Sequence, residues 1–268
     1  MRPILDYAVE KVPEVEVDTY VEKRIRLFEM FPNTYHSQKL SSLGFDHNRL
    51  LHVMDKAHEH NCTVLIDAED KTVQDVIDLQ TNSVIANGKD RGYRDDSVFK
   101  TYQMYRKDML EKLMEDLVEF RSCELTHNIK LVRGAYITSD HDIIHDTKED
   151  TDMDYNKAVL LLLKLAKNNN KVNVIFATHN EESIRLFKDV REPNIHHAFL
   201  MGMENPMWLE DPHEFRTNKM VHIPFGPIAK TYPYLLRRLV ENNPYTDIYV
   251  DRLRRKESVG SVGCYCYD

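Results

Sequence analysis

The sequence predicts an α/β fold, a single (β/α)8 TIM-like barrel. Eight short apolar runs alternate with polar or helix-period stretches, the pattern of a parallel sheet whose strands are joined by helices. The 268 residues match one such barrel, which typically needs about 250. Glycines also end several predicted strands, where chain reversal and close approach favour a residue without Cβ. These are Gly44, Gly134, Gly202 and Gly226.

The predicted strands and helices alternate along the whole chain. The strands span residues 4–10, 37–43, 63–69, 97–105, 129–136, 172–178, 197–203 and 220–226. Helix-period stretches include Thr19–Phe28, Asn48–His60, Lys107–Arg121 and Met153–Lys167. A last helix is predicted after Pro233, because proline suits a first turn and Asn242-Asn243-Pro244 is a stop signal. We expect one domain over residues 1–268, with a charged mobile loop at 140–154 and a flexible tail at about 256–268.

Charge and composition argue against several classes of protein. The net charge is −8 and the acidic residues are spread along the chain, so no basic surface for nucleic acid is expected. The four cysteines form no CxxC pair, which favours a reducing compartment over a disulfide framework. No apolar run approaches the roughly 18 residues of a membrane span, and no targeting segment is expected before Ile4.

Polar residues gather near the ends of the predicted strands. They are Lys39, Asp67, Glu69, Gln103, Lys130, Arg133, Tyr136, Thr178 and His179. In a barrel those ends form the catalytic face, so these residues predict a shared polar site. A structural role remains open for each, such as a helix cap for Asp67 or Thr178 and a solvated rim position for Lys39.

The last predicted helix carries one charged stripe. Tyr234, Arg237, Arg238 and Glu241 follow helical spacing on one side, while Leu235, Leu236, Leu239 and Val240 fall on the other. Two adjacent guanidinium groups match the geometry of a small carboxylic acid, since each can hold a carboxylate through two hydrogen bonds. The alternative is a solvated face with an ordinary Arg237–Glu241 pair.

Several common motifs are missing from the sequence. It contains no GxGxxG, GxxxxGK[ST], HExxH or GxSxG, so a dinucleotide fold, a P-loop, a zinc protease and a serine hydrolase find no support. No histidine has cysteine partners at ligand spacing, and we expect no metal site.

The sequence closely resembles the proline dehydrogenase family, the flavoenzymes that oxidise L-proline. The likeness runs nearly from end to end, through ordered fragments that include KLVRGAY (130–136), FATHN (176–180), IPFGP (223–227) and YLLRRLVEN (234–242). It implies a distorted (β/α)8 barrel with FAD, not NAD, at the carboxyl ends of the strands. It also implies hydride transfer to flavin N5, Δ1-pyrroline-5-carboxylate as product, a quinone electron acceptor with peripheral membrane association, and a mitochondrial location.

The resemblance also implies roles for individual residues. Arg237 and Arg238 would pair with the substrate carboxylate, and Glu10 would form a gate by pairing with Arg237. The residues expected to line the substrate pocket are Lys39, Asp67, Tyr136 and Tyr234. Those expected to contact or support the flavin are Gln103, Lys130, Arg133, Gly134, Thr178, His179 and Glu241.

The sequence departs from the family's pattern at three motifs, and the segment between its first two strands is much shorter than in animal members. His222 replaces the tyrosine that proline-specific members carry at the outer edge of the substrate ring, and members that prefer hydroxyproline also depart there. Phe199-Leu200-Met201 replaces the usual Gln-Leu, and Asp140-His141 replaces the usual Glu-Arg. These departures leave two alternatives open: a hydroxyproline dehydrogenase, or a non-catalytic barrel that binds a carboxylate or a protein partner.

Overall fold

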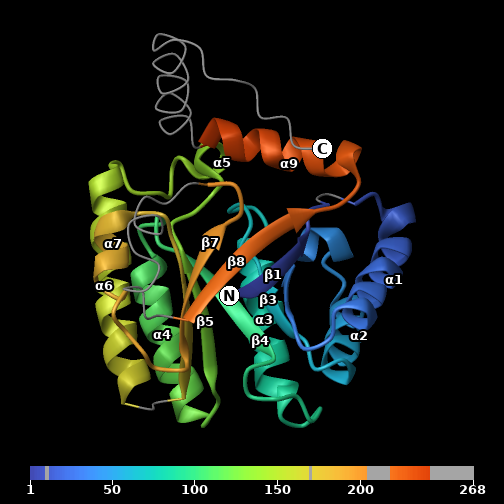
Figure 1. Cartoon of the computed structure of the whole chain (residues 1–268), viewed down its shortest axis with the longest axis horizontal. Helices are drawn as coiled ribbons and strands as arrows, with labels where there is room; N and C mark the ends of the chain where they lie inside the picture. Colours follow the sequence, from blue (N-terminus) through green and yellow to red (C-terminus); the bar gives the residue numbers. More distant parts are fainter. Residues whose placement is uncertain (10–11, 169–170, 204–217, 242–268) are drawn as a thin grey trace, which may run out of the picture.

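The computed structural model describes residues 1–9, 12–168, 171–203 and 218–241. Eight parallel strands form a closed barrel in chain order, as the sequence predicts (Figure 1). They are β1 (Arg2–Tyr7), β2 (Tyr35–Gln38), β3 (Thr63–Ile66), β4 (Val98–Gln103), β5 (His127–Val132), β6 (Val172–Ala177), β7 (Ile195–Leu200) and β8 (Asn218–Phe225). The barrel closes at β1, where Ile4 lies beside Tyr35 of β2 on one side and His222 of β8 on the other.

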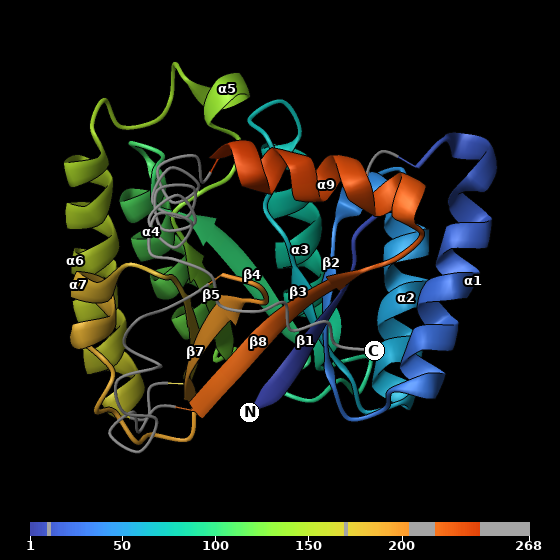
Figure 2. The same ribbon diagram turned by 45° about the horizontal axis from the view of Figure 1, so that its top comes forward.

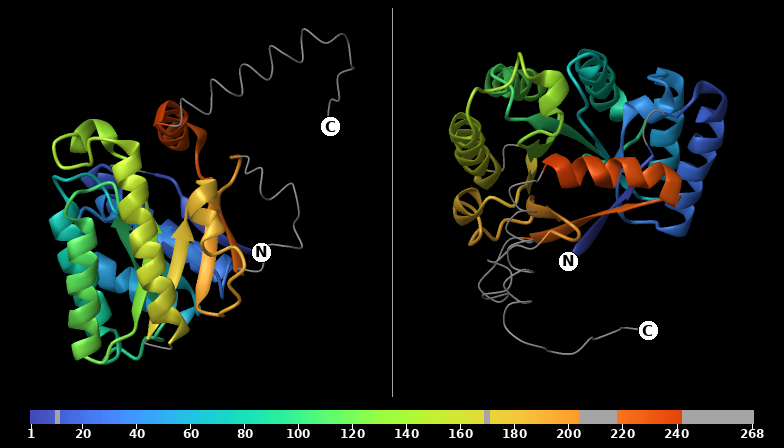
Figure 3. Two further views of the ribbon diagram at one scale, coloured as in Figure 1. Left: turned by 90° about the vertical axis from the view of Figure 1, so that its left-hand side faces the viewer. Right: turned by 90° about the horizontal axis from the view of Figure 1, so that it is seen from above.

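Helices surround the barrel and one crosses its carboxyl end. They are α1 (Glu14–Met30), α2 (His47–Glu59), α3 (Gln74–Gly88), α4 (Met109–Ser122), α5 (Ile137–Asp140), α6 (Lys148–Lys167), α7 (Glu181–Arg185) and α9 (Ile228–Glu241), with a 3-10 turn η1 (Leu40–Leu43). Figure 2 shows α5 and α9 at the same end of the barrel. Seen from above, α9 lies across the opening (Figure 3). Of the helices in the described ranges, none is both long and apolar enough to cross a membrane.

Several predicted boundaries differ from those of the structure. The second strand ends at Gln38, because Gln38 Nε2 and Ser42 Oγ both donate to the Lys39 carbonyl and turn the chain into η1. The last helix begins at Ile228, five residues before Pro233; its first turn starts at Pro227, whose carbonyl accepts from the amides of Lys230 and Thr231. Residues 148–154, expected to lie in a charged loop, belong to α6, which begins at Lys148.

The alternation of side chains along the strands separates two environments inside the barrel. An apolar cluster fills its interior and includes Ile4, Leu65, Phe99, Ile175, Ala198 and Met220. Because successive residues of a strand point to opposite faces, Asp6, Asp67 and His222 also point inward, each two residues after a member of that cluster. Lys130 points inward as well, since its neighbours Ile129 and Leu131 pack outside against the helices. The interior therefore becomes polar toward the carboxyl end.

Candidate functional site

Two lysines share one carboxylate inside the barrel. Lys130 Nζ donates to Asp67 Oδ1 at 2.7 Å, and Lys39 Nζ lies 3.5 Å from Asp67 Oδ2. All three side chains are buried. Burial opposes ionisation of Asp67, but the cations of Lys130 and Lys39 outweigh it and hold the pKa of Asp67 below its ordinary value. We call Lys39, Asp67 and Lys130 the charged layer.

Tyr136 closes one side of the charged layer. It precedes α5, and its hydroxyl lies 3.5 Å from Lys39 Nζ. The same ammonium lies 6.0 Å from the centre of the Tyr136 ring, a cation–π distance. The structure thus brings together three residues that the resemblance assigns to the substrate pocket.

Asp6 is a member of this site that sequence reasoning missed. The residue is 3% exposed, and its Oδ2 has no hydrogen-bond partner among the described residues. Burial and the nearby Asp67 anion raise the pKa of Asp6 to about 6, against the opposing effect of Lys39 and Lys130. The alternation along β1 points Asp6 inward, two residues after Ile4, but no sequence pattern shows that Asp6 lies beside His222.

His222 lies next to Asp6, on the neighbouring strand β8. Its Nε2 lies 3.8 Å from Asp6 Oδ2, beyond hydrogen-bond distance, and its Nδ1 has no hydrogen-bond partner in the described ranges. Burial and the cation of Lys130 lower the pKa of His222 to about 3. The imidazole is therefore neutral at physiological pH, and it presents a ring nitrogen to the interior of the barrel.

Two residues of the charged stripe predicted on the last helix, Tyr234 and Arg238, lie on the side of α9 that faces the barrel. Tyr234 is 3% exposed, and the Arg238 guanidinium lies 5.3 Å from the centre of its ring. Burial and the Asp6 carboxylate raise the pKa of Tyr234 to about 12. Leu235 and Leu236 lie on the exposed side of the helix. The side chains of Arg237 and Glu241, like residue Glu10, lie outside the described part of the chain.

Arg133 is held by a set of protein partners at the carboxyl ends of β5 and β6. Its guanidinium donates to Asp152 Oδ1 at 2.7 Å, to Thr178 Oγ1 at 2.5 Å and to Ser183 Oγ at 2.8 Å. It also lies 4.2 Å from the centre of the Tyr155 ring. Sequence reasoning selected Arg133 and Thr178 but not their partners from α6 and α7, which carry no motif that points to them.

Gln103 and His179 supply buried hydrogen-bonding atoms at the same end. Gln103 Oε1 and His179 Nδ1 have no hydrogen-bond partner within the described residues. His179 Nε2 accepts from the amide of Leu200 at 3.0 Å, and burial lowers the pKa of His179 to about 4. The neutral ring must then carry its proton on Nδ1. Among the described residues, Gln103 thus offers an acceptor and His179 a donor that bond to no other protein group.

Gly134 accommodates a neighbouring side chain. Its φ of +147° is a conformation that residues with a Cβ rarely adopt, and a Cβ at this position would overlap the ring of Tyr105. The glycine therefore allows the segment after β5 to pack closely on the segment after β4. Within the described ranges, no group of three or more histidine, cysteine or acidic side chains is arranged to hold a metal.

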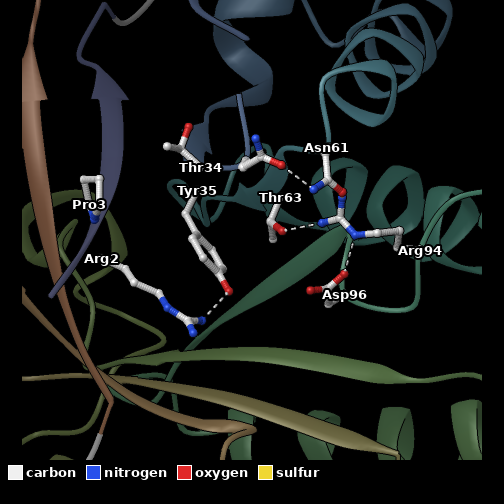
Figure 4. A pocket seen from close by; sticks show the side chains of 9 residues that line it. Arg2, Pro3, Thr34, Tyr35, Asn61, Thr63, Arg94 and Asp96 are labelled. Atoms are coloured by element: carbon white, nitrogen blue, oxygen red, sulfur yellow. Dashed lines mark hydrogen bonds and ion pairs between the residues drawn. The ribbon is translucent and has the colours of Figure 1, made fainter. Parts of the chain in front are cut away.

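A separate pocket of about 390 Å³ lies at the opposite end of the barrel (Figure 4). Arg2, Tyr35 and Arg94 are among the residues that line it. Arg94 is bonded within the pocket wall, at 2.9 Å to Asp96 and 3.1 Å to Thr63. The pocket is at the amino ends of the strands, whereas catalytic residues of such barrels come from the carboxyl ends. It is therefore not the candidate site.

These features define the class of (β/α)8 barrels with a buried polar site at the carboxyl ends of the strands. The sequence profile described as "Proline dehydrogenase" matches residues 2–247. The chain belongs to the proline dehydrogenase family, as its motifs predict.

Individual relatives agree with this assignment. The chain is 32% identical to "Proline dehydrogenase 1, mitochondrial" of Arabidopsis thaliana over 232 residues, covering 79% of the chain and 45% of that protein. It is 28% identical to "Hydroxyproline dehydrogenase" of Xenopus laevis over 214 residues, covering 72% and 45%. The chain thus spans less than half the length of either relative.

Solved structures share the fold. Proline utilization A (PutA) from Bdellovibrio bacteriovorus, inactivated by N-propargylglycine, superposes with a TM-score of 0.75 at 18% identity. The match covers 90% of this chain and 30% of that one. At this identity the likeness establishes the barrel alone.

Proposed function

We propose that this chain forms the barrel of an FAD-dependent enzyme that oxidises L-proline to Δ1-pyrroline-5-carboxylate. The observation that carries the proposal is the charged layer beneath α9, with Arg238 and Tyr234 on the helix face toward the barrel. A cyclic amino acid brings a carboxylate that arginine can hold through paired hydrogen bonds. Family membership and the names of the relatives support the same reaction.

The residues at the carboxyl end fit the polar edge of a flavin. The pyrimidine edge of an isoalloxazine carries both an N–H donor and carbonyl acceptors, which complement Gln103 Oε1 and the Nδ1 proton of His179. The ammonium of Lys130 would favour a reduced, anionic ring electrostatically. When bound, the flavin supplies the hydride acceptor, and the protein contributes position and charge.

The chain's own residues would orient the substrate. Arg237 and Arg238 would bind its carboxylate, and the buried Tyr234 ring would exclude water above it. Asp67 would keep the ammonium groups of Lys39 and Lys130 aimed into the site, because it binds both. This arrangement holds a substrate between α9 and the charged layer, where a fixed geometry lowers the barrier to hydride transfer.

Hydroxyproline is the second candidate substrate. His222 Nδ1 is a buried ring nitrogen without a hydrogen-bond partner in the described chain, and such a group can bond a hydroxyl on the substrate ring. The resemblance places His222 at the outer edge of that ring, and a hydroxyproline dehydrogenase is among the relatives. A barrel that binds a carboxylate or a protein partner without turnover is the alternative from another class.

The acceptor and location are proposed from the family. Relatives from Arabidopsis thaliana and Homo sapiens carry "mitochondrial" in their names, which supports a mitochondrial location. A membrane quinone as electron acceptor, with peripheral membrane association, follows from the resemblance alone.

Substrate oxidation by single-site variants tests the proposed substrate site. Each charge-assisted contact to a carboxylate contributes about 1.5 to 3 kcal/mol, so Arg237→Ala and Arg238→Ala should each raise KM by about 10- to 100-fold. Leu235→Ala, on the exposed side of the same helix, is the matched control and should behave as the wild type. Unchanged saturation by L-proline and trans-4-hydroxy-L-proline in both arginine variants would refute carboxylate binding by these residues.

A further inference from the structure

The carboxylate of Asp140 connects three loops at the carboxyl end of the barrel. Asp140 is fully buried. Its Oδ2 accepts from the Tyr105 hydroxyl at 2.5 Å, and its Oδ1 accepts from the Lys71 amide at 2.9 Å and from Ser139 Oγ at 3.0 Å. Lys71 follows β3, Tyr105 follows β4 and Asp140 follows β5. We call Asp140, Tyr105 and the Lys71 amide the Asp140 cluster.

Backbone bonds join the same loops on either side of this cluster. The Tyr105 amide donates to the Arg133 carbonyl at 2.7 Å, and the Tyr105 carbonyl accepts from the His145 amide at 2.8 Å. Arg106 and Ile144 form an antiparallel bridge. The loop after β5 is thus attached near both of its ends. The Asp140 carboxylate attaches the middle of this loop to the loops after β3 and β4.

Tyr136 is hydrogen-bonded to this cluster through the backbone. Its carbonyl accepts from the Asp140 amide at 2.9 Å, so the two residues are separated by one helical turn. The Tyr136 hydroxyl is the group that lies 3.5 Å from Lys39 Nζ. A movement of Asp140 would therefore carry Tyr136 with it and away from the charged layer.

We infer that Asp140 is a positioning residue, which holds the loop after β5 so that Tyr136 stays at the substrate site. It acts through Tyr136 and does not itself touch the substrate. The assignment to substrate binding rests on the proposed function, whereas the ordering of the loop does not. The resemblance marks Asp140-His141 as a departure from the family's pattern. In this structure the aspartate binds Tyr105 and the Lys71 amide.

The surroundings of the cluster provide a matched control. Lys71 Nζ forms an ion pair with Asp142, two residues after Asp140 in the same loop. That pair is largely solvated, with 53% of the Asp142 side chain exposed. Exposed ion pairs contribute little to stability, so Asp142→Asn removes a carboxylate from the loop without loosening it.

Hydrogen exchange of the full chain without substrate tests the ordering of the loop. Asp140→Asn and the milder Tyr105→Phe should both speed exchange in peptides that contain Lys71 and residues 134–146, while Asp142→Asn should not. Because this measurement needs no turnover, it remains decisive if the proposed oxidation is wrong. Unchanged exchange in Tyr105→Phe, or an equal increase in Asp142→Asn, would overturn the inference.

Steady-state oxidation of L-proline tests the route through Tyr136. Tyr105→Phe should raise KM by about ten-fold and change kcat by less than about three-fold, because the hydroxyl supports binding geometry only. In a Tyr136→Phe background, Tyr105→Phe should add little further to KM, since both changes remove the same contact. Full additivity of the two effects, or a loss of stability without a change in KM, would overturn the positioning role.

Discussion

Replacing Asp67 by asparagine should destabilise the barrel and abolish most activity. The carboxylate lies 2.7 Å from Lys130 Nζ and 3.5 Å from Lys39 Nζ. With an effective dielectric constant of about 20, these distances give attractions of about 6 and about 5 kcal/mol before desolvation is subtracted. Removing one partner of a buried pair typically leaves a net loss of about 3 to 5 kcal/mol, because the remaining charges stay buried.

Two effects should keep the Asp67→Asn loss near the lower end of that range. The asparagine oxygen can still accept from Lys130, and Asp6 becomes easier to ionise once the neighbouring Asp67 anion is gone. We therefore expect the free energy of unfolding in urea at pH 7 to fall by about 3 kcal/mol. Far-UV circular dichroism can follow the transition.

A double substitution separates the loss of a counter-ion from a general packing defect. Asp67→Asn/Lys130→Met should be more stable than Asp67→Asn alone, because the methionine removes a buried ammonium that has lost its partner. Activity should stay low in the double variant, since both the carboxylate of Asp67 and the ammonium of Lys130 are then missing. Equal urea midpoints for wild type and Asp67→Asn, or fully additive losses in the double variant, would refute the account of the charged layer.

Two further predictions follow from the geometry. Gly134→Ala should lower the free energy of unfolding by about 2 to 4 kcal/mol, because it adds strain at φ +147° and its Cβ overlaps Tyr105. The control is Gly92→Ala, at φ +74° with open space around it, which should lower the free energy of unfolding by less. The free energy of unfolding should also fall steeply below pH 6.5, because six buried or half-buried histidines have pKa values of about 3 to 4 in the folded chain: His36, His127, His179, His196, His197 and His222. Below pH 6.5 the unfolded chain binds more protons than the folded chain, so each of these histidines should lower the free energy of unfolding by about 2 kcal/mol at pH 5. An equal free energy of unfolding in urea at pH 7 and pH 5 would contradict this prediction.

The barrel could be predicted because local sequence patterns specify the order of its strands and helices. Apolar runs and helical periods specify which segments become strands, and eight alternations leave a closed parallel barrel as the natural arrangement. Lys39, Asp67 and Lys130 could be selected from their positions near strand ends. That two ammonium groups share one carboxylate depends on packing across the barrel, which no local pattern contains.

The residues that were missed depend on contacts between distant segments. Asp6 becomes part of the site only because β1 closes against β8, which brings it within 3.8 Å of His222. Asp140 lay in a stretch expected to be a mobile charged loop, since nothing in the sequence shows that Tyr105 and Lys71 approach it. The early start of α9 was missed because Pro233, a helix-start signal, lies inside the helix instead.

The proposed oxidation of L-proline is tested most directly by the absorbance of the purified chain with FAD, recorded without oxygen during a titration with L-proline. We predict a bound oxidised flavin whose visible absorbance bleaches as substrate is added, and which bleaches far less readily in Arg238→Ala. A chain that binds FAD but keeps its oxidised spectrum at saturating L-proline and trans-4-hydroxy-L-proline would contradict it.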